Sequence, residues 1–112
     1  MKDKDDDGWV SQMRKGLLEL CVLNALKGDP LYGYQIVKHL IESTHLVVAE
    51  GTIYPLLNRL LKEGLLKSEL RESDRGPVRK YYHLTPFGRE KMTNMNAGWQ
   101  SLQSAINHMI EE

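Results

Sequence analysis

The sequence lacks the features that mark a membrane-spanning or disulfide-bonded protein. No apolar run in the 112 residues approaches the roughly 18 that a membrane span requires, and no signal-peptide pattern opens the chain. The single cysteine, Cys21, excludes an internal disulfide, and its apolar neighbours predict a buried structural thiol. The expected compartment is therefore the cytoplasm.

Patterns typical of catalysis and metal binding are also missing. The four histidines are scattered, and none has a cysteine or carboxylate at metal-ligand spacing. There is no G-x-S-x-G, no glycine-rich loop that would cradle a phosphate, and no paired carboxylates in a plausible cleft. We therefore expect no metal, no cofactor and no enzymatic activity.

The chain has no net charge, but its charges are unevenly placed. The first seven residues hold two basic and four acidic side chains, which predicts a disordered acidic tail over residues 1–9. Residues 59–89 hold eight basic side chains against four acidic ones, a local excess of four. This excess suits a polyanionic partner, although a charged stretch is usually only a solvated surface.

Hydrophobic periodicity predicts a mainly α fold of the α+β class. Helices are expected over residues 11–27, 32–43 and 49–64, with a short extended piece at 46–48. The first helix is apolar nearly all round, so it needs cover on more than one side. The expected buried face of the second helix consists of Ile36, Val37, Leu40 and Ile41.

After Gly64 the pattern changes to that of a β-hairpin. Residues 65–72 and 78–84 are strand candidates, and the connection SDRGP has the residues of a turn. Thr85 followed by Pro86 then begins a last helix. This order predicts a winged helix-turn-helix over residues 10–84, with a two-stranded wing, and a long dimerisation helix over residues 85–112.

The helix at 49–64 takes the place of the recognition helix, and its first turn favours contact over helix stability. Gly51 admits close backbone approach, Thr52 offers a hydroxyl and a methyl, and Tyr54 offers a phenol. Pro55 is tolerated only near a helix start, which puts that start near residues 50–52. The alternative is that Thr52 only caps the helix and Tyr54 belongs to the core. The remaining candidate DNA contacts are Asn58 and Arg59, one turn on, and Arg75, Arg79 and Lys80 in the wing, where the alternative is a merely solvated hairpin.

Three motifs together resemble the PadR-like transcriptional regulators. They are Tyr32-Gly33-Tyr34, Gly51-Thr52-Ile53-Tyr54-Pro55, and Arg79-Lys80-Tyr81-Tyr82 followed by Leu84-Thr85. The resemblance implies a homodimeric winged-helix repressor of the short subfamily, which includes multidrug-responsive repressors. It also implies DNA contacts at Tyr32, Gly33 and Tyr34, in the recognition helix, and at the wing basics. The wing tip Asp74-Arg75-Gly76-Pro77 departs from the Gly-Gly-Arg type that many members have.

The last helix carries an apolar seam at spacings of three and four, which is typical of helix pairing. The predicted dimer interface joins this seam to the first helix through Met13, Leu17, Leu20, Met92, Met95, Trp99, Leu102, Ile106 and Met109. The alternative is packing within one chain. The resemblance further implies that Trp99 and its two-fold mate flank a flat aromatic effector, with Met13, Leu17 and Gln103 as neighbours. Plain packing is the alternative for this tryptophan.

The leading hypothesis is a dimeric repressor that binds double-stranded DNA at a near-palindromic operator and is released by a small aromatic or apolar ligand. Two other functions compete with it. One is a winged-helix module for protein association, and the other is a dimer that sequesters a small molecule without a DNA target.

Overall fold

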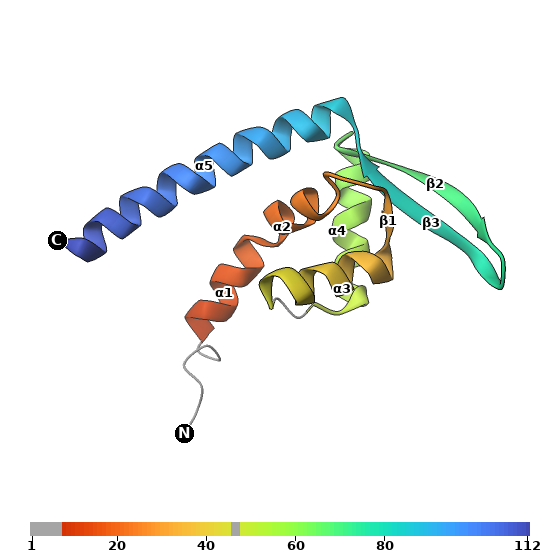
Figure 1. The fold of residues 1–112 in the computed structure, drawn as a ribbon, viewed down its shortest axis with the longest axis horizontal. Helices are drawn as coiled ribbons and strands as arrows, with labels where there is room; N and C mark the ends of the chain where they lie inside the picture. The colour runs from red at the N-terminus through yellow and green to blue at the C-terminus, as the bar shows by residue number, and fades with distance from the viewer. Residues whose placement is uncertain (1–7, 46–47) are drawn as a thin grey trace, which may run out of the picture.

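The structure is a computed structural model that describes residues 8–45 and 48–112. It has the predicted α+β architecture, in which a helical body carries a long wing on one side and a long C-terminal helix on the other (Figure 1). The elements are α1 (Gly8–Gly16), α2 (Leu18–Ala25), β1 (Leu31–Tyr32), α3 (Gly33–Thr44), α4 (Glu50–Lys62), β2 (Leu66–Ser73), β3 (Gly76–Leu84) and α5 (Pro86–Glu111). The acidic tail at residues 1–7 and residues 46–47 of the expected extended piece lie outside the described residues.

The first predicted helix is wrong in both its start and its continuity. It begins at Gly8, so Trp9 is helical rather than part of a tail, and it divides at Leu17 into α1 and α2. The N–H of Leu17 is shared between the carbonyls of Met13 and Arg14, at 3.2 Å each, and its ψ of 0° departs from helical geometry. Gly16 weakens the helix at this point because glycine loses more backbone entropy than other residues.

Within the described residues the sheet has three antiparallel strands in the order β1-β3-β2, and strand β1 was not predicted. Strand β1 is two residues long, and it pairs Leu31 with Tyr82 and Tyr32 with Tyr81. The helix expected to start at Tyr32 therefore starts one residue later, at Gly33, with Tyr32 as its N-cap residue. The short strand fixes the start of α3 against the root of the wing.

Strands β2 and β3 form the predicted wing, which projects beyond the helical body (Figure 1). Leu66 pairs with Leu84, Ser68 with Tyr82 and Leu70 with Lys80, and a bulge follows between Arg71 and Ser73. Since successive side chains of a strand point to opposite faces, the wing has two distinct surfaces. We call the surface that continues from the core side the inner wing face, with Leu70, Val78, Lys80 and Tyr82, and the opposite one the outer wing face, with Glu69, Arg71, Arg79 and Tyr81.

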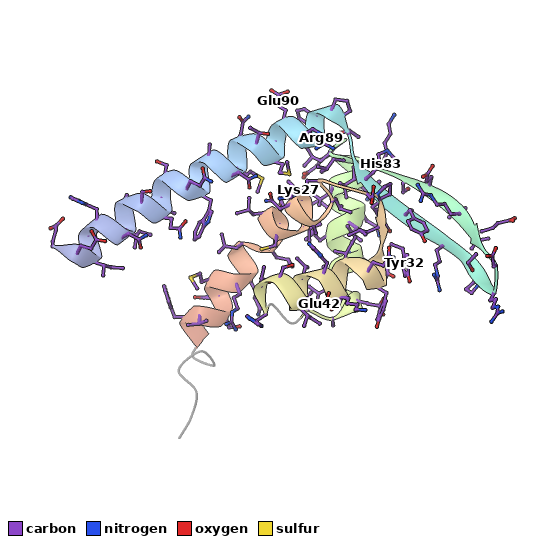
Figure 2. All side chains as sticks on the ribbon, in the orientation of Figure 1. Lys27, Tyr32, Glu42, His83, Arg89 and Glu90 are labelled. Carbon is purple, nitrogen blue, oxygen red and sulfur yellow. The ribbon has the colours of Figure 1, made fainter. Side chains whose placement is uncertain are left out.

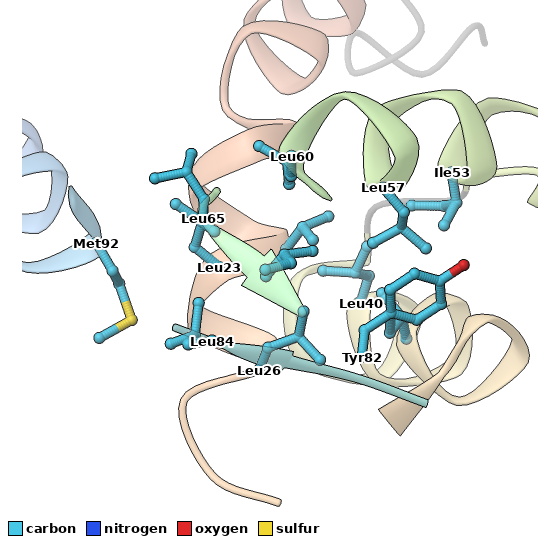
Figure 3. Packing of buried hydrophobic residues seen from close by; sticks show 13 residues of the cluster. Leu23, Leu26, Leu40, Ile53, Leu57, Leu60, Leu65, Tyr82, Leu84 and Met92 are labelled. Carbon is cyan, nitrogen blue, oxygen red and sulfur yellow. The ribbon is translucent and has the colours of Figure 1, made fainter. Parts of the chain in front are cut away.

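A single apolar core holds the helices on the root of the sheet (Figure 3). Its buried members come from every element except α1 and β1: Val22, Leu23, Leu26, Ile36, Leu40, Ile53, Leu57, Leu60, Leu65, Leu66, Tyr82, Leu84 and Met92. The predicted burial of Ile41 is wrong, because the side chain is 39% exposed at the margin of the α3 stripe. The core thus fixes α3 and α4 relative to the wing.

The end of α4 and the start of α5 are tied together at Thr85, the predicted N-cap. Its hydroxyl accepts from the N–H of Gly88 at 2.9 Å and donates to the carbonyl of Gly64 at 2.6 Å. Its own N–H donates to the carbonyl of Leu65 at 3.1 Å. Gly64 has a φ of 77°, which a residue with a side chain rarely adopts. We call this set of contacts the Thr85 junction.

Helix α5 leaves the Thr85 junction and runs past α2 to the end of the molecule opposite the wing (Figure 1). Only its first half packs on the body, and residues 100–112 are exposed throughout. A reciprocal amide pair joins the two helices: Asn24 donates to Asn96 at 2.8 Å, and Asn96 donates back at 3.0 Å. The amide of Asn24 also donates to the Leu20 carbonyl at 2.8 Å.

Candidate nucleic-acid interface

The exposed face of α4 brings together all six residues predicted there. Ile53, Leu57 and Leu60 are buried on one side of the helix. The opposite side consists of Gly51, Thr52, Tyr54, Pro55, Asn58 and Arg59, all of which are exposed. The helix therefore presents its polar first turn and the turn that follows to solvent as one surface.

Among the described residues, no side chain caps the start of α4, as is required of a helix end that contacts phosphate. Its N-cap is Ala49, whose side chain has no oxygen, and the N–H groups of Thr52 and Ile53 bond to the Ala49 carbonyl at 3.0 and 3.2 Å. The alternative in which Thr52 caps the helix is therefore wrong. Glu50 is the one acidic residue in this turn, and its carboxylate lies 3.4 Å from the Tyr54 hydroxyl. The helix end favours anions, and Glu50 offsets part of that preference.

Tyr54 connects α4 to α3 rather than belonging to the core. The side chain is 41% exposed, while its ring lies against Gly33. A Cβ at position 33 would stand 2.6 Å from Cζ of that ring, so a side chain there would displace the ring from this position. Burial and then the Glu50 carboxylate raise the pKa of Tyr54, which keeps the phenol neutral and able to donate a hydrogen bond.

The three residues of the Tyr32-Gly33-Tyr34 motif have different surroundings. Tyr34 is 56% exposed in the first turn of α3, where a contact with DNA is open to it. Gly33 is buried beneath Tyr54, so the structure gives it a packing role in place of the implied DNA contact. Tyr32, which is labelled in Figure 2, is half-buried. Its N–H donates to the side-chain oxygen of Gln35 at 3.1 Å.

Arg59 is held by carboxylates instead of being free for phosphate. Its guanidinium bonds to Glu19 of α2 at 2.5 Å and to Glu63, one turn on, at 3.1 Å. The hydrogen bond to Glu19, followed by that to Glu63, raises the pKa of Arg59. The contact with α2 therefore gives Arg59 a role in positioning the recognition helix, which its sequence spacing does not reveal.

The outer wing face stacks two arginines on two tyrosines. The guanidinium carbon of Arg79 lies 4.5 Å from the centroid of the Tyr32 ring, and that of Arg71 lies 4.6 Å from the Tyr81 centroid. The two rings meet edge to face at 5.3 Å, and Arg71 also pairs with Glu69. Cation–π contacts of this kind contribute about 0.5–1 kcal/mol at exposed sites. Arg79, a predicted phosphate contact, thus stiffens the root of the wing.

The other two predicted basic residues, Arg75 and Lys80, lie at the wing tip and on the inner wing face. Arg75 lies in the turn between β2 and β3, beside Asp74, and is exposed. The Lys80 ammonium lies 5.7 Å from the centroid of the Tyr82 ring, on the side of the sheet that carries the core. Both side chains are exposed on the wing.

Sequence comparison decides the family. A model of the PadR-like family of transcriptional regulators matches residues 22–94, well over half of the chain. The chain belongs to this family. Its members act in transcription, so this PadR-like protein is a DNA-binding regulator and not an enzyme.

Solved structures of similar regulators share the fold over nearly the whole chain. A PadR-like regulator from Bacillus cereus is 38% identical, with a TM-score of 0.82 over 90% of this chain and 98% of its own. A PadR-like transcription factor from Bacteroides fragilis is 45% identical, with a TM-score of 0.75 over 92% and 99%. The transcriptional regulator Rv3488 of Mycobacterium tuberculosis is 33% identical over 87% of this chain and 89% of its own.

The residues predicted for the dimer interface of this PadR-like regulator divide into two groups. Met92 is part of the protomer core, so its assignment to the interface is wrong, and Met95 packs against the same core. Further along α5, Leu102, Ile106 and Met109 are largely exposed. Ile110, which the predicted seam omitted, is exposed as well. The apolar seam therefore changes from internal packing to an uncovered surface near Trp99.

The predicted effector residues Met13, Leu17 and Trp99 line a shared cavity. This cavity has a volume of about 290 Å³, and Leu20 and Cys21 complete its apolar wall. A second cavity of about 550 Å³ lies between α2, α3 and α5, with Trp99, His39 and the Asn24–Asn96 pair in its lining. Gln103 lines neither of these two cavities. The asparagine pair was not predicted, because nothing in sequence marks two residues 72 positions apart as partners.

Cys21 lies between the two cavities and is half-buried, less enclosed than expected. Burial raises the pKa of its thiol, which keeps the sulfur protonated and weakly reactive. Within residues 8–45 and 48–112, no group of three histidine, cysteine or carboxylate side chains is placed to hold a metal ion. No helix in the same ranges is long and apolar enough to cross a membrane.

Proposed function

We propose that this regulator is a cytoplasmic, homodimeric repressor that binds a near-palindromic operator and is released by a small aromatic or apolar ligand. The observation that carries the DNA-binding part is the exposed polar face of α4, which lies opposite the buried apolar face of the same helix. A helix of this kind enters the major groove, with its first residues nearest to base edges and phosphates.

Within this interface the proposed roles follow the exposure of each residue. Thr52 and the backbone of Gly51 contact phosphate or a thymine methyl, and Asn58 reads a base edge one turn on. Tyr34 and Tyr54 donate their hydroxyls to the backbone from adjacent helix starts. Pro55 makes its contact through the ring alone, since it has no N–H to donate. Arg75 and Lys80 bind phosphate from the wing.

The second half of α5 supports the proposed dimer. Leu102, Ile106 and Met109 form an exposed apolar stripe at spacings of three and four, and α1 presents Met13 at 40% exposure. A monomer has no described element that covers this stripe, whereas a second copy brings an identical one. Two-fold symmetry would then place two recognition helices about 34 Å apart, one turn of DNA.

The ligand part of the proposal rests on Trp99. This side chain lines both cavities where the internal packing of α5 ends, so a flat aromatic molecule beside it would contact α5 and α1 together. Ligand binding would favour one angle between the paired α5 helices and change the spacing of the recognition helices. Such coupling typically amounts to about 1–3 kcal/mol.

The first experiment measures DNA binding by fluorescence anisotropy. The purified protein is titrated into labelled DNA from its own upstream region, at two salt concentrations, with unrelated DNA as competitor. We expect binding that survives competition and weakens steeply with salt, because several phosphates are contacted. Absence of binding to any DNA at low salt would contradict the proposal and favour a module for protein association.

Dimerisation and ligand release have separate tests. Sedimentation should show a dimer that the variant Ile106→Glu converts to monomer, because a charge would lie in the apolar seam. Planar aromatic probes should quench Trp99 fluorescence and weaken operator binding, with Trp9→Phe as the background that isolates the Trp99 signal. A probe that quenches Trp99 and leaves operator affinity unchanged would show ligand binding without release.

A further inference from the structure

The inner wing face carries two exposed apolar side chains in a place where polar residues would be expected. Leu70 is 71% exposed and Val78 is 52% exposed. Leu70 is opposite Lys80 in the register, and Val78 precedes Lys80 by two residues, so all three side chains share one face of the hairpin. We call Leu70 and Val78 the wing patch.

The wing patch lies beyond the reach of the core. On the same face the buried side chains stop at Leu66 and Tyr82, and Ser68 between them and the patch is half-buried. Single exposed apolar residues are common on protein surfaces. Two adjacent ones on a hairpin that projects into solvent carry a risk of strand pairing between molecules, which proteins usually avoid with charge or proline.

The surroundings of the patch combine apolar surface with positive charge. Lys80 flanks it on the same face, and Arg75 is exposed at the tip. Residues 67–80 hold five basic side chains (Lys67, Arg71, Arg75, Arg79 and Lys80) and three acidic ones (Glu69, Glu72 and Asp74). A partner that suits this surface has negative charge on either side of an apolar wall.

The patch also faces the same way as the recognition helix. The inner wing face continues through Tyr82, whose side chain is buried in the same core as Ile53 and Leu57 of α4. Burial, and then the neighbouring Tyr54, raise the pKa of Tyr82. The outer wing face points in the opposite direction, and its arginines rest on tyrosine rings. One partner can therefore contact the start of α4 and the wing patch together.

We propose that Leu70 and Val78 contact the deoxyribose rings that wall the DNA minor groove, while Arg75 and Lys80 bind the phosphates on either side. This rests on the proposed function, since it assumes that the wing meets the operator bound by α4. Sugar rings offer apolar C–H surface between two rows of phosphates, which matches the pattern of the wing. Minor-groove proteins use apolar side chains in a comparable way.

The contact would respond to groove shape rather than to base identity. Apolar side chains have no donor or acceptor for base edges, but they touch both sugar walls only where the groove is narrow enough. Narrow minor grooves occur in A·T-rich tracts. The wing patch would thus favour operators with such a tract next to the sequence that α4 reads.

The test compares the variant Leu70→Thr/Val78→Thr with the wild-type protein on an operator fragment selected from random DNA. Threonine keeps the branched shape that strands favour, so the hairpin should persist. We expect operator affinity to fall about tenfold, from the loss of buried apolar contact, with no change in the dependence on salt. Hydroxyl radicals attack deoxyribose from the minor groove, and protection of the sugars beside the α4 site should disappear in this variant.

Matched controls separate this inference from the proposed function. Phe87→Ala removes an equally exposed apolar side chain at the start of α5 and should leave affinity and footprint unchanged. Lys80→Gln should lower the salt dependence by about one phosphate contact. If wild-type protein protects guanine N7 in the major groove and the wing-patch variant keeps full affinity and sugar protection, the inference is overturned while DNA binding stands. If the wild-type protein protects no DNA, the proposed function fails with it.

Discussion

The phenol ring of Tyr54 lies directly over the backbone of Gly33, so the first turns of α4 and α3 meet as a ring on a bare glycine. A side chain at position 33 would overlap this ring. The close approach of the Tyr54 ring to α3 therefore depends on the absence of a Cβ at position 33, and DNA affinity should depend on this buried glycine.

The variant Gly33→Ala should displace Tyr54 and weaken operator binding by about tenfold or more, with a loss of about 1–3 kcal/mol in the free energy of unfolding. Anisotropy and thermal unfolding measure the two effects. Gly51→Ala is the matched control for stability, because nothing lies within 4 Å of a Cβ at that position of α4. The control should be neutral or stabilising by up to about 1 kcal/mol. Equal destabilisation by both variants would contradict the packing role of Gly33.

Replacing Thr85 should loosen the Thr85 junction. The side chain is buried, and its hydroxyl both caps α5 and bonds to the Gly64 carbonyl. Thr85→Ala should cost about 1–3 kcal/mol of unfolding free energy, since the helix cap is lost and the Gly64 carbonyl loses its donor. Thr85→Ser keeps the hydroxyl and should recover most of the loss. A serine variant as unstable as the alanine variant would show that the methyl group, rather than the hydrogen bonds, is responsible.

The Asn24–Asn96 pair should behave as a coupled unit. Asn96→Ala leaves the Asn24 amide without its partner in a half-buried site, with an expected cost of about 1–2 kcal/mol. The double variant with Asn24→Ala should cost less than the sum of the two single variants, which a double-mutant cycle of unfolding free energies measures. Additive costs would mean that the two amides do not interact in solution.

Arg75 and Arg59 should differ in their effect on salt dependence. Arg75→Gln is expected to reduce the slope of log affinity against log salt by about 1, because one phosphate contact is lost. Arg59→Gln should leave the slope nearly unchanged, because this guanidinium pairs with Glu19 and Glu63. Equal slopes for both variants and the wild type would remove Arg75 from the interface.

Stability should fall in alkaline solution through Cys21 and two tyrosines. The folded protein raises the pKa of Cys21 above 9.0 and the pKa values of Tyr54 and Tyr82 above 10.0, so it resists a proton loss that the unfolded chain undergoes. The stability present below those values is lost as pH rises through the folded pKa values. The midpoint of thermal unfolding should therefore decline from about pH 9, and Cys21→Ala should delay the decline toward pH 10. An unchanged onset in that variant would exclude the thiol as a cause.

The sequence was sufficient where local chemistry decides structure. The wing, the Thr85 cap and the exposed face of α4 follow from turn residues, capping preference and helical spacing, which act within a few residues. Strand β1 could not be predicted from its local sequence, because its two residues form a strand only by pairing with the edge of β3, about fifty positions later. The placement of Met92 in the core, and the engagement of Arg59 with Glu19, depend in the same way on which elements become neighbours. Spacing along a helix identifies a face, and only the tertiary structure identifies what that face meets.

The Thr85 junction attaches the start of α5 to the C-terminal end of the recognition helix α4. A helix of 26 residues measures about 39 Å, at roughly 1.5 Å of rise per residue. A pivot of about 10° at Thr85 would move its far end about 7 Å by simple geometry, and it would also disturb the packing of Met92 and the Asn24–Asn96 pair. A shift of that size at the far end of α5 corresponds to only a slight rotation at Thr85, beside the C-terminal end of α4. The hydrogen bonds of Thr85 are the direct connection through which any movement of α5 would reach the end of α4.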